Sequence, residues 1–410
     1  MYKKVTACRS CGSSGLQEII HFGTTALADA LLTKDQLNSD EIRVPLTLAF
    51  CPSCSLTQIL EEVPPEILFC RDYPYYSSVS NYLLEHFGQS AEYIIESRKL
   101  NSNSFVTEAA SNDGYMLKNF VAKNIPVLGI DPAEGPAKVA VEKGIPTLNT
   151  FFTKDLAINY FQKEARYADV FLANNVLAHV PDLNGFVEGI SILLKEDGVA
   201  VIEAPYLLDL VDKCEFDTIY HQHFCYFSVT ALDKLFRRHG LYLNDIKRVA
   251  IHGGTLRMFI EKKENQKESV LSLLKAEAER KVNCLEFFDE FKNNVFRIKE
   301  SLMRILTELK AQGKSIAGYG AAAKSNTLQS FFGIDGKYID YIADLSKFKQ
   351  GLYFSGNHIP IVSPARVREE MPDYILILAW NFADEIMKQL SDYKEKGGKF
   401  IIPIPEPRIV

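Results

Sequence analysis

The chain has 410 residues, of which 47% are hydrophobic and 24% charged, a composition that excludes wholesale disorder. At roughly 150 residues per domain, this length predicts about two to three domains. The formal net charge of −6 argues against a nucleic-acid partner. We find no secretory signal and no apolar run approaching the roughly 18 residues of a membrane span. We therefore expect a cytoplasmic protein with no membrane partner.

Residues 1–70 are predicted to form a zinc-binding domain. Half of the eight cysteines fall in two Cys-x-x-Cys pairs, Cys8 with Cys11 and Cys51 with Cys54. In a cytoplasmic chain this spacing favours a metal over disulfides, and four thiolates suit tetrahedral zinc. Four protein ligands leave no open position, so the zinc is expected to be structural. Four unrelated buried thiols are the alternative, and a redox pair is less favoured because neither pair lies in a βαβ pattern.

Residues 71–264 are predicted to form an α/β domain with a parallel sheet. Apolar runs at 104–108, 127–131, 168–173 and 198–203 alternate with helical stretches. Ligands of such sheets bind at the carboxyl ends of the strands. The first turn, residues 108–114, has small side chains but too few glycines for a pyrophosphate cradle. This favours S-adenosylmethionine over NAD, with a turn that binds no ligand as the alternative.

Several residues at these strand ends are candidates for the cofactor site. Asp131 ends the second strand, where it can accept hydrogen bonds from a ribose diol, and Gly114 permits an unusual backbone angle. The predicted cofactor-binding residues are Glu108, Ala110, Asn112, Gly114, Asp131, Pro132, Asn174 and Asn175.

The remainder of the chain is predicted to be a helical connector, residues 265–313, and a second Rossmann-like α/β domain, residues 314–410. The turn from Gly318 to Ala323 fits G-x-G-x-x-A after a strand, and Asp344 follows about one strand later. By pattern this is a dinucleotide fingerprint, which supports an NAD-dependent oxidoreductase as an alternative function. The start of the following helix, with Lys324 and Ser325, could equally hold a phosphate or line a substrate cleft.

Two further segments carry polar chemistry. Residues 217–226 place His221 and His223 in an aromatic setting, where a neutral imidazole can act as a general base and Tyr220 can donate to an enolate oxygen. The alternative is that the two histidines are partly buried and only stack in a hydrophobic loop. A metal site is less favoured because no third ligand is evident. Residues 73–80 are rich in hydroxyls and suit a polar ligand such as a sugar nucleotide, or form an ordinary domain junction.

Taken together, these motifs resemble the bacterial deoxysugar C-methyltransferases that use S-adenosylmethionine. The resemblance covers nearly the whole chain, from the four cysteines through residues 73–78, 112–114, 174–181, 220–223, 252–254 and 318–325 to 375–381. It implies a zinc-binding domain, a central Rossmann-like class I methyltransferase sheet and a C-terminal Rossmann-like domain that closes the site. Members methylate carbon 3 of nucleotide-linked 4-keto sugars, after a base removes the proton alpha to the ketone to give an enolate.

The resemblance also implies roles for particular residues. His223 would be the base, Tyr220 and Tyr75 would polarise or position the sugar, and His179 would lie beside the methyl-transfer centre. Gln222 departs from the family, whose well-described members carry a carboxylate immediately before the catalytic histidine. The predicted catalytic residues are His223, Tyr220, Tyr75, His179 and Gln222, and the predicted substrate-binding residues are Tyr76, Ser77, Ser78, His221, His252, Lys324 and Ser325.

The expected partner is therefore a small-molecule substrate, a nucleotide-linked sugar. The amide of Gln222 leaves the acceptor atom open, so an O- or N-methyltransferase acting on a sugar or another small metabolite is an alternative. A non-catalytic zinc-finger module is disfavoured by the net charge of −6 and by the polar aromatic residues around two histidines. The oligomeric state is left open, a monomer included.

Overall fold

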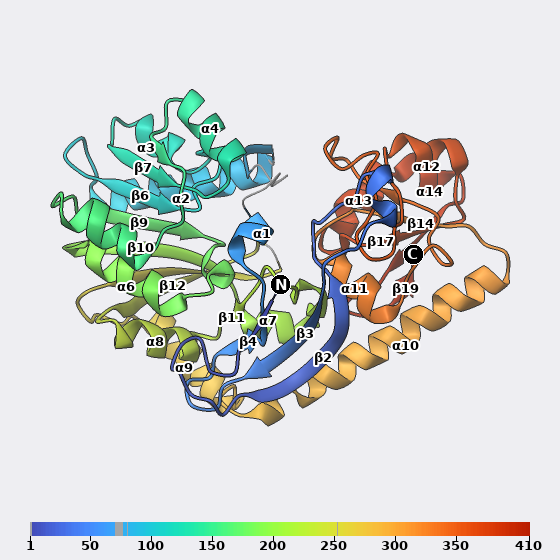
Figure 1. The fold of residues 1–410 in the computed structure, drawn as a ribbon, viewed down its shortest axis with the longest axis horizontal. Coiled ribbons are helices and arrows are strands. Elements are labelled where there is room, and N and C mark those ends of the chain that lie inside the picture. The colour runs from blue at the N-terminus through green and yellow to red at the C-terminus, as the bar shows by residue number, and fades with distance from the viewer. Residues whose placement is uncertain (1, 70–76, 80, 252) are drawn as a thin grey trace.

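The computed structural model describes residues 2–69, 77–79, 81–251 and 253–410. Figure 1 shows two α/β lobes, one central in the sequence and one C-terminal, with the long N-terminal strands β2 and β3 running beneath and between them. Among the helices of the described residues, none is both long enough and apolar enough to span a membrane.

The N-terminal unit is an antiparallel sheet that borrows one strand from the middle of the chain. Its strand order is β11-β4-β3-β2, with β2 Gln17–Ala26, β3 Arg43–Phe50, β4 Thr57–Ile59 and β11 Cys225–Tyr226. A second, two-stranded sheet pairs β1 (Lys3–Lys4) with β5 (Glu61–Glu62). The short helices η1 (Lys34–Asn38) and α1 (Pro65–Phe69) complete the unit. Five successive residues of β3 are buried because the sheet is covered on both faces.

The central sheet has seven strands in the order β12-β13-β10-β9-β6-β7-β8. The strands are β6 Val106–Ala109, β7 Val127–Ile130, β8 Thr147–Leu148, β9 Ala168–Asn174, β10 Leu194–Pro205, β12 Tyr242–Val249 and β13 Thr255–Glu261. Strands β6 to β10 run parallel, whereas β13 is antiparallel to both β10 and β12. The strand order reverses between β6 and β9, and this reversal is where ligands of open α/β sheets bind.

Alternating side chains of the central sheet fill two separate cores. Val106, Val127 and Val201 pack toward α2 (Asn81–Arg98), α3 (Lys118–Val121) and α4 (Glu134–Glu142). Ala109, Ile130 and Ile202 face the opposite core, which includes α6 (Leu183–Leu193) and α8 (Val229–Arg238). This alternation follows from the two-residue period of a strand. Shorter helices lie in the connections: α5 Lys154–Leu156, η3 Ala157–Gln162, η4 Leu177–His179, α7 Leu207–Asp212 and η5 Phe216–Thr218.

Helices α9 (Glu268–Glu279), η6 (Leu285–Phe288) and α10 (Asp289–Ala311) lead to the C-terminal domain. The buried residues of α10 recur at helical spacing, from Phe291 through Val295, Ile298 and Leu302 to Leu309, so one face of this helix packs on the core. The C-terminal sheet has the order β16-β15-β14-β17-β18-β19. Its strands are β14 Ile316–Tyr319, β15 Ile342–Ala343, β16 Ile361–Val362, β17 Tyr374–Ile377, β18 Lys399–Ile402 and β19 Arg408–Ile409. Its helices are α11 Ser325–Phe332, α12 Ala365–Glu370, η7 Trp380–Phe382, α13 Ala383–Gln389 and α14 Ser391–Glu395.

The predicted fold class is confirmed. The central sheet has the class I methyltransferase strand order, a second Rossmann-like sheet follows it, and the four cysteines cluster in the N-terminal unit. Pairing of β11 with β4 was not predicted, and it makes a segment of the central domain part of the N-terminal sheet.

Candidate active site

The four predicted zinc ligands lie together. The sulfur atoms of Cys8 and Cys54 are 3.4 Å apart, those of Cys11 and Cys51 are 3.5 Å apart, and all four lie within 4.8 Å of one another. Tetrahedral zinc with bonds of about 2.3 Å places its sulfur ligands roughly 3.8 Å apart. The hydrogen bond from Cys8 lowers the pKa of Cys54 to about 5 and raises the pKa of Cys8. The arrangement therefore fits a zinc ion bound by four protein ligands.

The two halves of this cysteine cluster have the same backbone geometry. The amide that follows each pair donates to the carbonyl of its first cysteine, from Gly12 to Cys8 at 2.9 Å and from Ser55 to Cys51 at 2.8 Å. Gly12 has φ 74° and Ser55 has φ 67°, so both adopt the left-handed conformation that this tight turn requires. Glycine is suited to that conformation, whereas Ser55 adopts it at a cost.

The turn after β6 surrounds a buried carboxyl group. Glu108 is 0% exposed, and its Oε1 accepts a hydrogen bond of 3.0 Å from Asn174 Nδ2 at the end of β9. Burial raises the pKa of Glu108 well above its usual value. Its Oε2 is buried and has no hydrogen-bond partner among the described residues. Such an acceptor is expensive to bury alone, and a cationic ligand group would satisfy it.

Asp131 holds the same turn from the neighbouring strand. Its two carboxylate oxygens accept 2.8 Å hydrogen bonds from the backbone amides of Asn112 and Ala133. Burial raises the pKa of Asp131 to about 6. Each oxygen keeps a second lone pair, so the carboxylate can support the turn and still accept from a ligand. Pro132 follows directly and is half-buried.

The backbone at this edge of the sheet is unusual. Ala110, Asn112, Gly114 and Asn175 all have positive φ, at 54°, 50°, 79° and 55°. Residues other than glycine adopt a positive φ at a cost in conformational energy, and residues strained in this way are concentrated at ligand sites. A Cβ atom on Gly114 would come within 2.2 Å of the end of the Ile145 side chain, which would have to move, and the positive φ of 79° favours glycine there.

Ser77 and Ser78 lie on this turn. The amide of Ser77 donates to Asn112 Oδ1 at 2.9 Å, and the hydroxyl of Ser78 donates to Asp113. Lys143 Nζ also contacts Asp113, at 3.0 Å. The structure thus brings two predicted substrate-binding residues to the predicted cofactor site. Three other predicted residues, Tyr75, Tyr76 and His252, lie outside the described residues.

His223 has a defined hydrogen-bond environment. Its Nδ1 is 2.8 Å from the carbonyl oxygen of Thr218, and its Nε2 is 3.2 Å from the hydroxyl of Tyr220. A carbonyl can only accept, so this contact assigns the proton of a neutral imidazole to Nδ1. The lone pair then resides on Nε2, on the side of Tyr220.

His179 lies beside His223, with 4.7 Å between the ring centroids. Its Nδ1 is 2.6 Å from the carbonyl oxygen of Gln222, which again places the proton on Nδ1. Burial lowers the pKa of His179 to about 4, so this imidazole is neutral at neutral pH. The structure therefore brings three of the predicted catalytic residues, His179, Tyr220 and His223, close together.

His221 and Gln222 point elsewhere. His221 Nε2 lies 2.9 Å from the carbonyl oxygen of Pro45 on β3, and the ring is almost completely buried. Burial lowers its pKa. Gln222 contributes to the wall of a cavity of ≈ 380 Å³, which is also lined by residues 26–32, by residues 39–42 and by Ser355.

Lys324 and Ser325 start helix α11 in the C-terminal domain. Lys324 Nζ lies 3.8 Å from the centroid of the Trp380 ring, and Trp380 Nε1 donates to Asp217 Oδ2 at 2.7 Å. Burial lowers the pKa of Lys324 and raises that of Asp217. Ser325 is buried, and its hydroxyl donates to the carbonyl of Ala322 at 2.6 Å. Asp217 and Trp380 were not predicted as site residues, because they lie far apart in the chain.

The glycines of the G-x-G turn are explained by packing. A Cβ on Gly320 would come within 2.6 Å of Ala379, and one on Gly318 within 2.9 Å of Ile342. Asp344, which follows β15, accepts a 2.6 Å hydrogen bond from the amide of Ala321, so its carboxylate holds the G-x-G turn after β14. The turn therefore gives no support to the alternative of an NAD-dependent oxidoreductase.

The sequence matches three family descriptions in order. Residues 8–69 match a zinc binding domain, residues 80–245 a methyltransferase domain and residues 250–405 a C-methyltransferase C-terminal domain. The chain is also 32% identical to the C-methyltransferase NovU of Streptomyces niveus over 411 residues, covering 100% of this chain and 97% of NovU. The chain belongs to the C-methyltransferase family. It is an S-adenosylmethionine-dependent methyltransferase, and the predicted family, cofactor and zinc are confirmed.

Solved structures similar to part of this C-methyltransferase include a S-adenosylmethionine-dependent methyltransferase from Clostridium acetobutylicum. It has a TM-score of 0.36 at 14% identity and covers 44% of this chain and 92% of that one. Magnesium protoporphyrin IX methyltransferase from Synechocystis, with bound SAM, has a TM-score of 0.34 at 10% identity, covering 43% and 79%.

The turn after β6 fits the cofactor of this family. Three buried acceptor oxygens there, Glu108 Oε2, Asp113 Oδ1 and Asn175 Oδ1, have no hydrogen-bond partner among the described residues. S-adenosylmethionine carries a cationic ammonium and a cationic sulfonium, which match acceptors rather than donors. The chemistry of this donor set thus agrees with the methyltransferase assignment.

Proposed function

We propose that this C-methyltransferase transfers the methyl group of S-adenosylmethionine to carbon 3 of a nucleotide-linked 4-keto-deoxysugar, with His223 as the base. The observation that carries the proposal is the tautomer of His223. Its Nδ1 proton is bound by the Thr218 carbonyl, which leaves an unprotonated Nε2 beside the Tyr220 hydroxyl. An imidazole held in this way can accept a proton from a substrate carbon.

The reaction needs a base because a saturated carbon carries no lone pair. His223 Nε2 takes the proton alpha to the ketone, and the electron pair of that C–H bond becomes an enolate. Bound S-adenosylmethionine would supply an electrophilic methyl group: the enolate carbon would form the new C–C bond as the S–CH3 bond breaks, and the electron pair of that bond would stay on the sulfur of S-adenosylhomocysteine. The imidazolium of His223 then returns its proton to solvent. Tyr220, whose hydroxyl lies 3.2 Å from His223 Nε2, would donate to the oxygen on which charge develops.

The two neighbouring histidines are weaker candidates for the base. Burial lowers the pKa of His179 to about 4, so its imidazole has little affinity for a proton. His221 is directed at Pro45 and is buried against β3. We assign His179 to the wall of the methyl-transfer centre, where its neutral ring contacts that of His223.

The cofactor and the substrate are proposed to approach His223 from different domains. The cofactor would occupy the carboxyl edge of β6, β7 and β9, contacting Glu108, Asp131 and Asn175. The sugar nucleotide would lie against the C-terminal domain, where the half-buried Lys324 offers a cation to its phosphates. The amide of Gln222, on the wall of the ≈ 380 Å³ cavity, would then contact the bound sugar.

Exchange of the substrate proton in heavy water tests carbon as the acceptor. With S-adenosylhomocysteine in place of the methyl donor, the enzyme should wash deuterium into carbon 3 of a nucleotide 4-keto-deoxysugar, because deprotonation precedes methyl transfer. His223→Asn should abolish both this exchange and turnover with labelled S-adenosylmethionine, while S-adenosylhomocysteine binding stays nearly unchanged. The control is His239→Asn, since His239 lies at the end of α8, where its Nε2 is 2.9 Å from Asn184 Oδ1. Methylated product without exchange would identify an oxygen or nitrogen acceptor and refute the proposal.

A further inference from the structure

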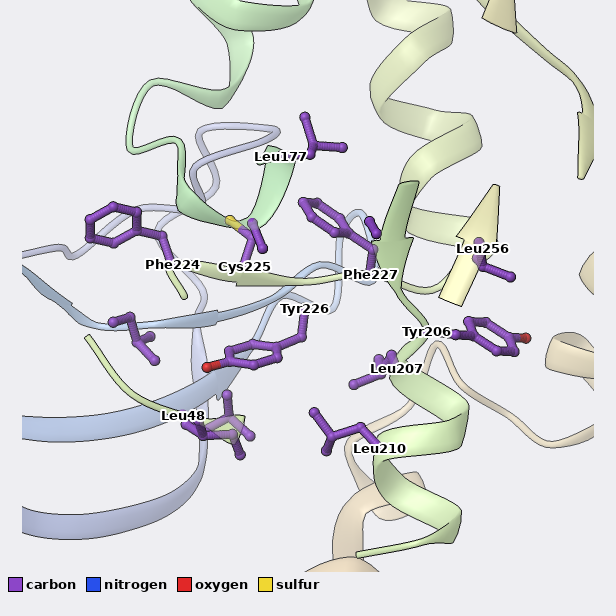
Figure 2. Packing of buried hydrophobic residues seen from close by; sticks show 14 of the residues in the cluster. Leu48, Leu177, Tyr206, Leu207, Leu210, Phe224, Cys225, Tyr226, Phe227 and Leu256 are labelled. Atoms are coloured by element: carbon purple, nitrogen blue, oxygen red, sulfur yellow. The ribbon is translucent and has the colours of Figure 1, made fainter. Parts of the chain in front are cut away.

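We call residues 220–226, which include the proposed base His223, the catalytic segment. Its last two residues form strand β11 of the zinc-domain sheet. In strand β11, Cys225 pairs with Gln58 and Tyr226 with Thr57 of β4. The pairing extends one residue further, because the amide of Ile59 donates to the carbonyl of Phe224 at 3.0 Å. Figure 2 shows the Phe224–Phe227 segment in a buried apolar cluster with Leu177 on one side and Leu48 and Leu210 on the other. The backbone on the C-terminal side of His223 is therefore fixed by β4.

Strand β4 starts three residues after the zinc ligand Cys54, so little chain separates the metal site from the catalytic segment. On its other side, the amide of Phe224 donates to the carbonyl of Ala178 at 2.7 Å, next to His179. The position of His223 thus depends on two neighbours, the zinc-domain sheet and the turn of η4.

Arg9 joins these elements through its side chain. It lies inside the first Cys-x-x-Cys pair, and only 3% of its side chain is exposed. Its guanidinium carbon lies 4.9 Å from the centroid of the Phe224 ring, directly after His223 in sequence. The same guanidinium contacts Glu62 on β5 and donates to the carbonyl of Pro181 at 3.3 Å.

The backbone of Arg9 adds a further link. Its amide donates to Gln58 Oε1 at 2.8 Å, and Gln58 is the β4 residue opposite Cys225. A single residue of the metal-binding turn therefore contacts β4, β5, the segment after His179 and the ring after His223.

The charge of a loaded metal site explains why a guanidinium is buried here. Arg9 Nε and Nη2 are buried without a hydrogen-bond partner among the described residues, which is costly for a cation. Four thiolates with one zinc ion carry a net charge of −2, so a cation in the same turn is stabilised when the site is loaded. The position of Arg9, and with it the Phe224 ring, is expected to depend on the metal.

We propose that Arg9 is a positioning residue that couples the loaded zinc site to His223. The inference rests on the proposed function, because it takes His223 as the base. It extends the expected structural role of the zinc from holding the N-terminal domain together to fixing the geometry of the catalytic segment.

The test uses Arg9→Met and Arg9→Lys, with Arg98→Met as the matched control. Arg98 also pairs with a glutamate, Glu261, but on the far strand β13. The main readout is the exchange rate of the His223 Nδ1 proton, observed by NMR of histidine-labelled full-length enzyme and assigned with His223→Asn. Zinc content, S-adenosylhomocysteine affinity and kcat are measured on the same samples.

We expect Arg9→Met to keep its zinc and to bind S-adenosylhomocysteine within about twofold of wild type. Its Nδ1 proton should exchange on the order of tenfold faster or more, and kcat should fall by up to roughly 10²-fold, since small misplacements of a catalytic group cost that much. Arg9→Lys should recover only part of this loss, because an ammonium lacks the planar group that stacks on Phe224. Chelation of zinc from the wild type should accelerate the same exchange, and should add little to Arg9→Met.

Unchanged exchange and kcat in zinc-loaded Arg9→Met would overturn the inference. If Arg9→Met loses its zinc, the zinc-loaded Arg9→Lys variant becomes the test. An Nδ1 exchange rate equal to that of the wild type in this variant would refute coupling through the stacked guanidinium. Failure of the proposed function is a separate result. It would appear as full activity of His223→Asn, whereas the exchange rate still reports whether Arg9 holds the imidazole.

Discussion

Replacement of Glu108 by glutamine should weaken cofactor binding and, at the same time, stabilise the free protein. The glutamine can keep the 3.0 Å hydrogen bond from Asn174, so the change removes mainly the negative charge. We propose that this charge accepts a hydrogen bond from the cationic cofactor through Oε2, which has no partner among the described residues. Loss of a hydrogen bond between charged groups costs about 1.5–3 kcal/mol. This corresponds to a roughly 10- to 150-fold weaker Kd for S-adenosylhomocysteine.

The effect on stability has the opposite sign. Burial raises the pKa of Glu108 well above its usual value in the folded protein, so at neutral pH the buried charge opposes folding. This penalty shrinks as the pH falls below the folded-state pKa, and it is lost only below the ordinary pKa of a glutamate, where the group is protonated in both states. Glutamine carries no charge, so Glu108→Gln should raise the Tm of the free protein at neutral pH and lose this advantage in acid.

Calorimetry and thermal unfolding separate the two effects. Titration of S-adenosylhomocysteine into wild type should show affinity that falls as the pH is lowered, with proton release visible as a dependence of the heat on the buffer. Both features should be reduced in Glu108→Gln. The matched control is Glu92→Gln, at an exposed position on α2, which should change neither quantity. Affinity within about twofold of wild type, or a lower Tm for the free variant, would refute the reasoning.

Two other substitutions test the ion pair between Arg257 and Glu203 of β10 and the glutamine at position 222, where well-described family members carry a carboxylate. Arg257→Leu removes the 2.6 Å partner of the buried Glu203 and leaves it His86, at 3.0 Å, so it should cost about 3 kcal/mol, the lower end for a broken buried pair, or roughly 6–12 °C in Tm by differential scanning calorimetry. Arg98→Leu, at a more exposed pair, should cost about 1 kcal/mol or less, and equal losses would contradict the burial argument. Gln222→Glu places a carboxylate on the wall of the ≈ 380 Å³ cavity, directed away from His223, so it should stabilise the imidazolium only through space and move the acidic limb of the pH–rate profile up by less than about one pH unit. An unmoved limb would show that the two side chains do not interact.

Much of the fold could be predicted because its signals are local. The strand ending at Asp131 is an apolar run followed by proline, and the structure has β7 at Val127–Ile130 with the carboxylate directly after it. The zinc site could be predicted because thiolates at a fixed short spacing have few other uses in a reducing compartment. In both cases, a few neighbouring residues carry the physical information.

The contacts that orient the imidazole of His223, the proposed base, could not be predicted in this way. Strand β11 has only two residues, Cys225 and Tyr226, too few to show a periodic pattern. Its partner β4 lies far away in sequence, and a backbone pairing leaves no mark on side-chain identity. The hydrogen bond from His223 to Thr218 uses a carbonyl that every residue possesses. Strand β11 and the Thr218 carbonyl orient His223 only because of where the tertiary fold places them, which their residue types do not reveal.

The segment around His223 is held by all three domains rather than by secondary structure of its own. The zinc-domain strand β4 pairs with it on one side, and the carbonyl of Ala178 in the central domain binds the amide of Phe224. The hydroxyl of Thr327 on C-terminal helix α11 donates to the carbonyl of Ile219 at 2.5 Å. A side chain held by three domains loses its geometry when any one of them shifts. With His223 as the proposed base, disruption of either terminal domain should act on the chemical step even where the cofactor turn is untouched. This dependence gives a physical reason for the zinc domain and the C-terminal domain to share one chain with the methyltransferase sheet.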